Sequence, residues 1–166
     1  MKLRIGNSMD IHRFEKGRKL ILGGVEIPYS KGLAGHSDAD CVLHVVAESI
    51  LGALALGDLG KHFPDTDPKF AGIDSSILVT EVMKMAKNKG YSINNIDISI
   101  VAEAPMLAPH IDGMRTKVAK LLETEITNVS IKATRGEKLG FIGRKEGILA
   151  QATVLLINSN YELKKL

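Results

Sequence analysis

The sequence predicts a layered α/β (α+β) domain, in which a mixed β-sheet carries helices packed on one face in the order ββααβαββ. Segments rich in Val and Ile alternate along the chain with segments of helical periodicity, and glycines and prolines separate them. No repeat or low-complexity linker divides the 166 residues. We therefore expect residues 1–166 to form one domain, with a mostly polar tail over 158–166 that frays.

The first half of the chain begins with two expected strands, Leu3–His12 and Lys19–Ile27, because apolar residues alternate or cluster there around glycines. Tyr29–His36, with two glycines, is expected to be a loop. A helix is then predicted over Ala39–Leu56. Ser37 and Asp40 resemble a capping box at its start, and apolar residues recur at helical spacing at Val42, Val45, Val46, Ile50, Ala53 and Leu54.

The second half of the chain begins with a break in the helical pattern. Gly57–Gly60 ends the first helix, and the prolines of Phe63–Pro68 cannot continue it, because each lacks a backbone donor and restricts the residue before it. The apolar spacing predicts two more helices, Ser75–Lys89 and Pro109–Glu123. The remaining strands are expected at Asn95–Ala102, Val129–Ala133 and Ile148–Ile157.

Composition excludes several classes of protein. With 22 Lys plus Arg against 19 Asp plus Glu, the net charge of +3 provides no extended basic field for nucleic acid, and without Trp a base-stacking platform is not expected. The single Cys41 excludes an internal disulfide and indicates a reducing, cytoplasmic setting. We expect no membrane partner, because the N-terminus lacks a secretory signal and the most apolar window, Val42–Leu56, is too short to span a bilayer.

The set Asp10-x-His12 and His36-x-Asp38-x-Asp40-x3-His44 predicts a metal site. Side chains two apart on a strand share a face, so Asp10 and His12 can hold one ion together. Asp40, His44 and Glu48 form one helical stripe, and one of them could approach that strand. Two histidines and a carboxylate would make a three-ligand zinc centre with an open fourth position. The alternative is a hydrogen-bonded core His44 and a surface His12.

Three further features have both a functional and a structural interpretation. Cys41 could reach a metal from the helix, although a free Cys there is usually a small buried apolar residue. Asp65 and Asp67 could hold a cation or accept substrate hydroxyls, or they could form a proline-flanked turn. The glycine-rich Lys132–Arg144 could cradle phosphate, with Glu137 holding magnesium, or it could be a hairpin connection with a solvated basic rim.

Taken together, several ordered blocks give the chain a resemblance to the 2-C-methyl-D-erythritol 2,4-cyclodiphosphate synthases of non-mevalonate isoprenoid biosynthesis. The resemblance spans nearly the whole chain and rests on Arg4–Gly6, Asp10–His12, Ile21–Tyr29, His36–Asp40, Gly57–Pro68 and Glu137–Phe141. It implies a single catalytic domain that converts 4-diphosphocytidyl-2-C-methyl-D-erythritol 2-phosphate into the 2,4-cyclodiphosphate and releases CMP. It also implies a homotrimer with active sites between subunits.

The resemblance also implies roles for individual residues. Asp10, His12 and His44 would hold Zn²⁺, and Glu137 would help to hold Mg²⁺ or Mn²⁺. Catalytic contributions would come from four residues, Ser37, Glu48, Thr134 and Arg135. The cytidine diphosphate-linked substrate would contact His36, Ser37, Asp58, Gly60, Asp65, Asp67, Ala102, Ala104, Pro105, Met106, Leu107, Ala108, Thr134, Phe141 and Arg144.

The sequence departs from the family pattern around the expected pocket but not at the metal ligands. Asn7–Met9 replaces a usual His-Gly-Phe, Glu48 stands where Asp is usual, and Met106 replaces a typical Lys. Arg135–Gly136 replaces two threonines, so that a hydroxyl expected to contact the diphosphate is missing and Arg135 could substitute by charge. Two alternatives to the synthase remain: a metal-dependent phosphoesterase, and a non-catalytic oligomer that binds a nucleotide or isoprenoid phosphate through Gly140–Arg144.

Overall fold

A computed structural model of the chain describes residues 3–64, 66–70 and 72–158. The expected tail therefore lies almost entirely outside the described residues, as does Asp65. The elements follow in the order β1 (Leu3–Lys16), β2 (Leu20–Leu22), β3 (Val25–Ile27), β4 (Lys31–Leu33), α1 (Cys41–Ala53), α2 (Leu59–His62), α3 (Ser75–Asn88), β5 (Tyr91–Val101), α4 (Ile111–Leu122), β6 (Val129–Thr134), α5 (Gly140–Gly143) and β7 (Gly147–Asn158). Short 3₁₀ turns lie at Pro68–Phe70, Ala108–His110 and Ile126–Asn128.

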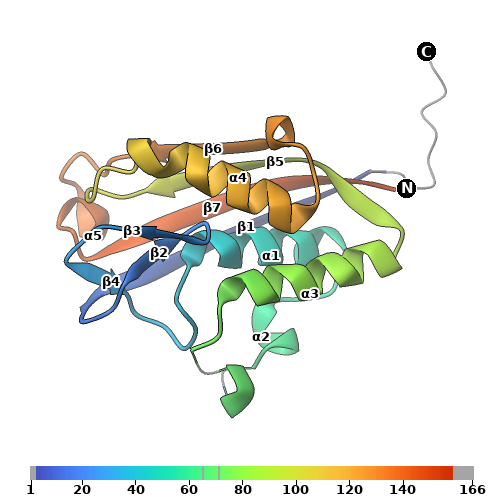
Figure 1. Cartoon of the computed structure of the whole chain (residues 1–166), viewed down its shortest axis with the longest axis horizontal. Helices are drawn as coiled ribbons and strands as arrows, with labels where there is room; N and C mark the ends of the chain where they lie inside the picture. Colours follow the sequence, from blue (N-terminus) through green and yellow to red (C-terminus); the bar gives the residue numbers. More distant parts are fainter. Residues whose placement is uncertain (1–2, 65, 71, 159–166) are drawn as a thin grey trace.

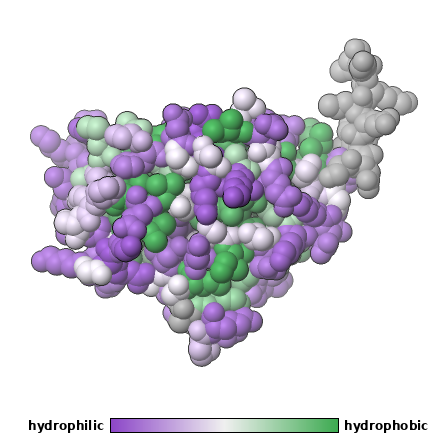
Figure 2. Space-filling view, viewed as in Figure 1, coloured by the Kyte–Doolittle hydropathy of each residue, from purple (hydrophilic) through white to green (hydrophobic). Residues whose placement is uncertain are grey.

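A five-stranded sheet in the order β4-β1-β7-β5-β6 forms one layer of the molecule. Only the β5–β6 pair in the described sheet is parallel, so the expected mixed sheet is confirmed. Helices α1, α3 and α4 lie side by side over one face of the sheet, as expected (Figure 1). Figure 2 shows this helical side, where the apolar side chains form small separate groups among polar ones.

The core lies between the sheet and α1. Ten of the thirteen residues of α1 are buried, and they pack against β1 and β7. Helix α3 packs against α1 through a narrower apolar stripe centred on Val79 and Val82. Helix α4 packs against β6 through a similar stripe centred on Met114 and Val118. The helix predicted over Ser75–Lys89 is confirmed to within one residue.

Two expectations for the segment between β1 and α1 are wrong. Lys19–Ile27 is not one strand of the main sheet but a separate hairpin, β2–β3, because Gly23 and Gly24 both adopt positive φ (58° and 72°) and turn the chain in two residues. The expected loop Tyr29–His36 contains β4, which pairs antiparallel with the end of β1. The simple order ββααβαββ is corrected accordingly.

The boundaries of α1 also differ from the prediction. The cap is Asp40 rather than Ser37, and the helix runs from Cys41 to Ala53, because the Asp40 carboxylate accepts the N–H groups of Val42 and Leu43 at 3.1 and 3.0 Å. The same carboxylate accepts the N–H groups of the β2–β3 turn at 2.9 and 2.6 Å. It thereby joins the hairpin to the start of the helix.

Two connections expected to be loops contain a helical turn. Asp58 caps α2 by accepting the Lys61 N–H at 2.9 Å. The connection after β6 contains α5, where Gly143 approaches the Lys138 backbone so closely that an added Cβ would lie 2.0 Å from its carbonyl carbon. The third long helix begins at Ile111, after a 3₁₀ turn, rather than at Pro109.

Candidate metal centre and pocket

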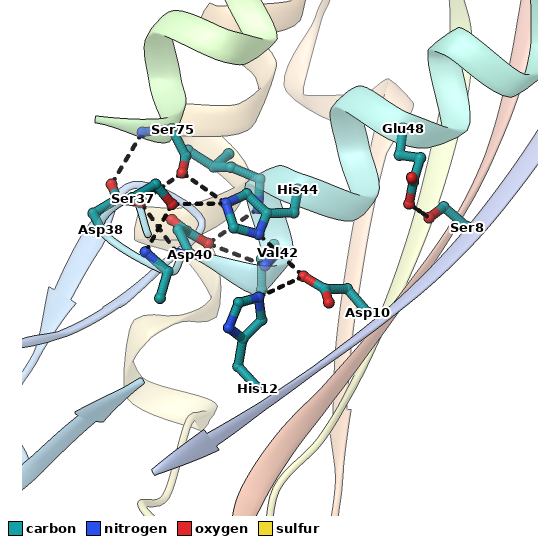
Figure 3. Close-up of polar contacts among 12 residues, drawn as sticks. Ser8, Asp10, His12, Ser37, Asp38, Asp40, Val42, His44, Glu48 and Ser75 are labelled. Atoms are coloured by element: carbon teal, nitrogen blue, oxygen red, sulfur yellow. Dashed lines mark hydrogen bonds and ion pairs between the residues drawn. The ribbon is translucent and has the colours of Figure 1, made fainter. Parts of the chain in front are cut away.

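Asp10, His12 and His44 converge where β1 crosses the first turns of α1 (Figure 3). Alternate residues of β1 point toward the helices, so Asp10 and His12 share the face that α1 covers. The Asp10 Oδ2 atom lies 2.9 Å from His12 Nε2 and 3.0 Å from His44 Nδ1. The three side chains are partly buried, and one potential ligand atom from each lies within 4.8 Å of the others. The three residues that the spacing singles out thus lie together, and they could hold a metal ion.

The other two members of the predicted helical stripe have different partners. Asp40 is the fully buried cap described above; burial raises its pKa to about 6, against the backbone N–H groups that favour its ionised form. Glu48 accepts the Ser8 hydroxyl at 2.6 Å, one helical turn beyond His44 (Figure 3). Cys41 is completely buried, and its burial raises the thiol pKa, as expected for a packed apolar residue.

The charges of the group favour a bound cation. Burial disfavours the charged form of Asp10, but the hydrogen bonds to His12 and His44 outweigh this effect and hold the pKa of its carboxyl well below the usual range. Burial also lowers the pKa of His12, but the Asp10 contact and the Ala34 carbonyl raise it above the usual value. An ionised carboxylate beside two imidazole nitrogens offers the negative charge and the ligand atoms that a divalent ion requires.

Outer partners orient both imidazoles toward the centre. His12 Nδ1 lies 2.5 Å from the Ala34 carbonyl oxygen, an acceptor only, so Nδ1 carries the proton and Nε2 faces Asp10 without one in the neutral ring. His44 Nε2 lies 3.1 Å from Ser37 Oγ and 3.0 Å from Ser75 Oγ, which leaves Nδ1 facing Asp10. This donor set fits a divalent metal with two nitrogen ligands and one oxygen ligand.

A pocket of about 330 Å³ lies beside the group. Seven of the predicted site residues line it, namely Asp10, His12, His36, Ser37, His44, Glu48 and Gly60. The rest of its lining is mainly apolar and comes from Gly35, Leu59, Phe63, Phe70, Ile73 and Leu78. The metal group therefore opens into a cavity large enough for part of a small molecule.

The remaining predicted residues that the structure describes do not line this pocket. Asp58 is a helix cap, and Asp67 forms an ion pair with Lys69 at 3.1 Å. A second group lies where β5 and β6 end, and Figure 1 shows the following α5 segment at the left end of the molecule. The Ala102 N–H donates to the Thr134 carbonyl at 3.0 Å, and Arg144 pairs with Glu146 at 2.7 Å. This second group comprises Ala102, Ala104, Pro105, Met106, Leu107, Ala108, Thr134, Arg135, Glu137, Phe141 and Arg144.

Sequence patterns missed three contacts of the centre. Ser75 and Asp38 lie behind His44, and Arg18 donates to the Gly35 and Ser37 carbonyls at 2.9 and 2.5 Å, which fixes the loop that carries Ser37. Asp38 stands in the His36–Asp40 motif, which was a usable signal. Ser75 begins a helix after the capping Asp74, so its position indicates only a helix start.

Fold and site together define an α/β protein in which a strand and a helix bring together three residues that could hold a divalent metal. The chain belongs to the YgbB family, whose profile matches residues 3–157. A 2-C-methyl-D-erythritol 2,4-cyclodiphosphate synthase of Bacillus cytotoxicus is 55% identical over 153 residues, 92% of this chain and 97% of that protein. The synthase of Bacillus mycoides is 54% identical over the same shares. These findings confirm the resemblance expected from the sequence.

Solved structures agree. The bifunctional IspDF of Campylobacter jejuni matches with a TM-score of 0.91 and 39% identity over 95% of this chain. The chain spans only 42% of that longer protein. IspF of Plasmodium falciparum, solved as a CDP complex, matches with a TM-score of 0.84 and 33% identity over 96% of this chain and 98% of that one. No helix in the described part of the chain is long and apolar enough to cross a membrane.

Proposed function

We propose that this chain is a 2-C-methyl-D-erythritol 2,4-cyclodiphosphate synthase of non-mevalonate isoprenoid biosynthesis, acting as one catalytic domain. The observation that carries the proposal is the convergence of Asp10, His12 and His44 at a pocket, in a chain 55% identical to named synthases over nearly its whole length. The single buried Cys41 is consistent with the cytoplasmic setting proposed here.

The reaction requires no protein nucleophile. An oxygen of the substrate 2-phosphate attacks the distal phosphorus of the diphosphocytidyl group, the bond from that phosphorus to the CMP oxygen breaks, and the cyclic diphosphate forms. The second pKa of a phosphate monoester is about 6, so the attacking group is already ionised at neutral pH. The protein's task is then to position two phosphates against each other and to reduce their repulsion.

The residues of the pocket suit that task. Asp10, His12 and His44 would hold Zn²⁺, for which two imidazoles and a carboxylate with an open position are typical ligands. When bound, the ion supplies positive charge beside the diphosphate. Ser37 presents a hydroxyl in the same pocket, and Glu48, also in the lining, is held by Ser8. The exposed Glu137 carboxylate is an oxygen ligand of the kind that Mg²⁺ or Mn²⁺ prefers.

We further propose a homotrimer in which a neighbouring subunit completes each site. The outward face of β1 exposes Ile5 and Met9 (72% and 59%), with Leu3 and Ile11 on the same face, and exposed apolar rows of this kind mark contact surfaces. The second group of predicted residues does not line the pocket of its own chain. It would supply the cytidine contacts, with Thr134 and Arg135 near the diphosphate, to the pocket of a neighbour. Asp58, Asp65 and Asp67 would face the erythritol hydroxyls.

Phosphorus NMR tests the reaction directly. The zinc-loaded protein, incubated with the cytidyl substrate and Mg²⁺, should yield the cyclic diphosphate and CMP in equal amounts. Release of inorganic phosphate without cyclisation would favour the metal-dependent phosphoesterase instead. Tight binding of the substrate without turnover, with both metals present, would favour a non-catalytic nucleotide-binding or isoprenoid-phosphate-binding oligomer.

A further inference from the structure

Two side chains, the buried Ser75 and the partly buried Asp38, lie behind His44, on the side away from Asp10 (Figure 3). Ser75, the first residue of α3, is completely buried, and its Oγ atom lies 3.0 Å from His44 Nε2. The same hydroxyl donates to Asp38 Oδ1 at 2.5 Å, and the Ser75 N–H donates to Asp38 Oδ2 at 3.1 Å. The Asp40 N–H also donates to Asp38 Oδ1, at 3.2 Å. In each of these three contacts the Asp38 carboxylate is the acceptor.

These contacts determine where the protons lie. A carboxylate only accepts hydrogen bonds, so the Ser75 hydroxyl proton points toward Asp38. The Ser75 oxygen can then only accept from His44, which places a proton on His44 Nε2. In a neutral imidazole this leaves Nδ1 with a free lone pair, and Nδ1 is the atom that faces Asp10 at 3.0 Å. The chain Asp38–Ser75–His44 thus ends in a lone pair directed at the metal centre.

We propose that Asp38 and Ser75 are positioning residues that hold His44 in the Nε2–H form and in the ring orientation that binds metal. The inference rests on the metal centre of the proposed function. A carboxylate that acts on an imidazole through a hydroxyl raises the electron density at the opposite nitrogen, which strengthens a metal bond there. The pair also joins the start of α3 to the centre, so that helix packing sets the angle of the His44 ring.

The same placement of protons leaves the Ser37 hydroxyl proton free to be donated. Its Oγ atom accepts the Ala39 N–H at 3.1 Å and lies 3.1 Å from His44 Nε2, so the Nε2–H can be shared between the two serine oxygens. Both lone pairs of Ser37 are then in use, and its own proton remains available to a ligand oxygen in the pocket that it lines. Ser75 thus orients His44 for metal binding, whereas Ser37 can donate a hydrogen bond to a molecule bound in the pocket.

Neighbouring serines provide a matched pair of variants. Ser75→Ala removes the link to Asp38, whereas Ser76→Ala removes a buried hydroxyl for which the described residues offer no hydrogen-bond partner. Zinc affinity, measured by competition with a chelating indicator and without substrate, should fall about 10- to 100-fold for Ser75→Ala. It should stay within about 2-fold of wild type for Ser76→Ala. Equal affinities for the two variants would overturn the proposal.

A ring-proton signal separates positioning from general destabilisation. In the zinc-loaded wild type, the His44 Nε2–H should appear in a proton–nitrogen NMR correlation as a downfield signal that exchanges slowly with water. It should weaken or shift in Ser75→Ala and stay unchanged in Ser76→Ala. Asp38→Asn is a second variant with the same expected loss, because its amide NH₂ would face one of the N–H groups that now donate to Asp38. An unchanged signal in folded Ser75→Ala would refute the positioning role.

The two proposals fail differently. If wild-type protein makes the cyclic diphosphate but Ser75→Ala retains both zinc affinity and the ring-proton signal, the synthase assignment stands and the positioning role is wrong. If wild-type protein binds zinc and the variants behave as expected but no cyclic product forms, the positioning role stands and the proposed reaction is wrong. The Ser37→Ala variant completes the comparison, with an expected rise in KM for the substrate and a smaller loss of zinc affinity than in Ser75→Ala, because Ser37 lacks the link to Asp38.

Discussion

Gly6 is the position where the fold and the metal centre depend most directly on one residue. It lies on β1 directly beneath α1, and a Cβ added there would lie 1.8 Å from the Ser49 carbonyl oxygen and 2.7 Å from the Ala53 nitrogen. Both atoms belong to the helix backbone, which no change of side-chain rotamer can move. Restoring an ordinary contact of about 3.5 Å requires α1 to move away from β1 by roughly 1.5 to 2 Å.

The cost of Gly6→Ala follows from that displacement. Overpacking costs about 1–3 kcal/mol when side chains can adjust, and occasionally more. Here a helix with ten buried residues must shift as a whole, so we expect the free energy of unfolding to fall by at least about 3 kcal/mol. The same shift would separate His44 of α1 from Asp10 and His12 of β1. Metal sites tolerate changes of only about 0.2 Å in ligand distance, so zinc affinity should also fall.

The control is Gly52→Ala, on α1 itself. A Cβ at Gly52 would have only the Asn7 carbonyl oxygen nearby, at 3.9 Å, so this variant should gain up to about 1 kcal/mol from helix propensity. Urea unfolding of the metal-free variants, followed by far-ultraviolet circular dichroism at one protein concentration, measures both. A Gly6→Ala protein within about 1 kcal/mol of wild type would refute the close contact between β1 and α1.

The remaining predictions concern the metal and the assembly. Asp10→Ala and His44→Ala should each lose bound zinc by metal analysis while keeping wild-type circular dichroism; unchanged zinc in both would refute the ligand assignment. In metal-free protein, the raised pKa of His12 means that its ion pair with Asp10 contributes stability fully below about pH 6.5, and this contribution is lost as pH rises through the folded pKa. Zinc affinity should instead increase with pH, because protons compete with the metal for the histidine nitrogens. Thermal melts at pH 6 and 8, with and without zinc, measure both the stability of the metal-free protein and the stabilisation by zinc. Ile5→Asp and Met9→Asp should reduce the mass in solution from trimer to monomer, whereas a trimer in both variants would place the subunit contact elsewhere.

The parts of the fold that the sequence predicts are those with long periodic patterns. β1 and β7 alternate over 14 and 12 residues, and α1 and α3 repeat their apolar positions over three or more turns. The wrong expectations fall where elements are three or four residues long. β2, β3, β4 and α5 are too short to show a period, and their existence depends on pairing with distant residues. The Gly23–Gly24 pair was the one local signal of the hairpin.

The contacts of the site also divide into those that local spacing predicts and those that it does not. The two-residue spacing of Asp10 and His12 fixes their common face, because side chains alternate along any strand. The contact with Ser75 has no such rule, since it joins residues 31 apart through the packing of α3 against α1. The resemblance implies a site shared between subunits, and in the structure only part of the predicted residues line the pocket of one chain. The chemical type of a site residue can be predicted from the sequence. Which of these residues come into contact is determined by tertiary packing.

One geometric relation explains why His44 and Glu48, but not Asp40, face β1. The strand and α1 run in opposite directions, and two strand residues advance about 6.6 Å while four helix residues advance about 6 Å. Successive inward residues of β1 therefore meet successive turns of α1: Gly6 lies against Ser49 and Ala53, Ser8 meets Glu48, and Asp10 meets His44. The next step along the strand, His12, passes the end of the helix, where Asp40 is already engaged as the cap. The metal centre thus forms where this alternating match between strand and helix ends, and the open space beyond the helix terminus belongs to the pocket.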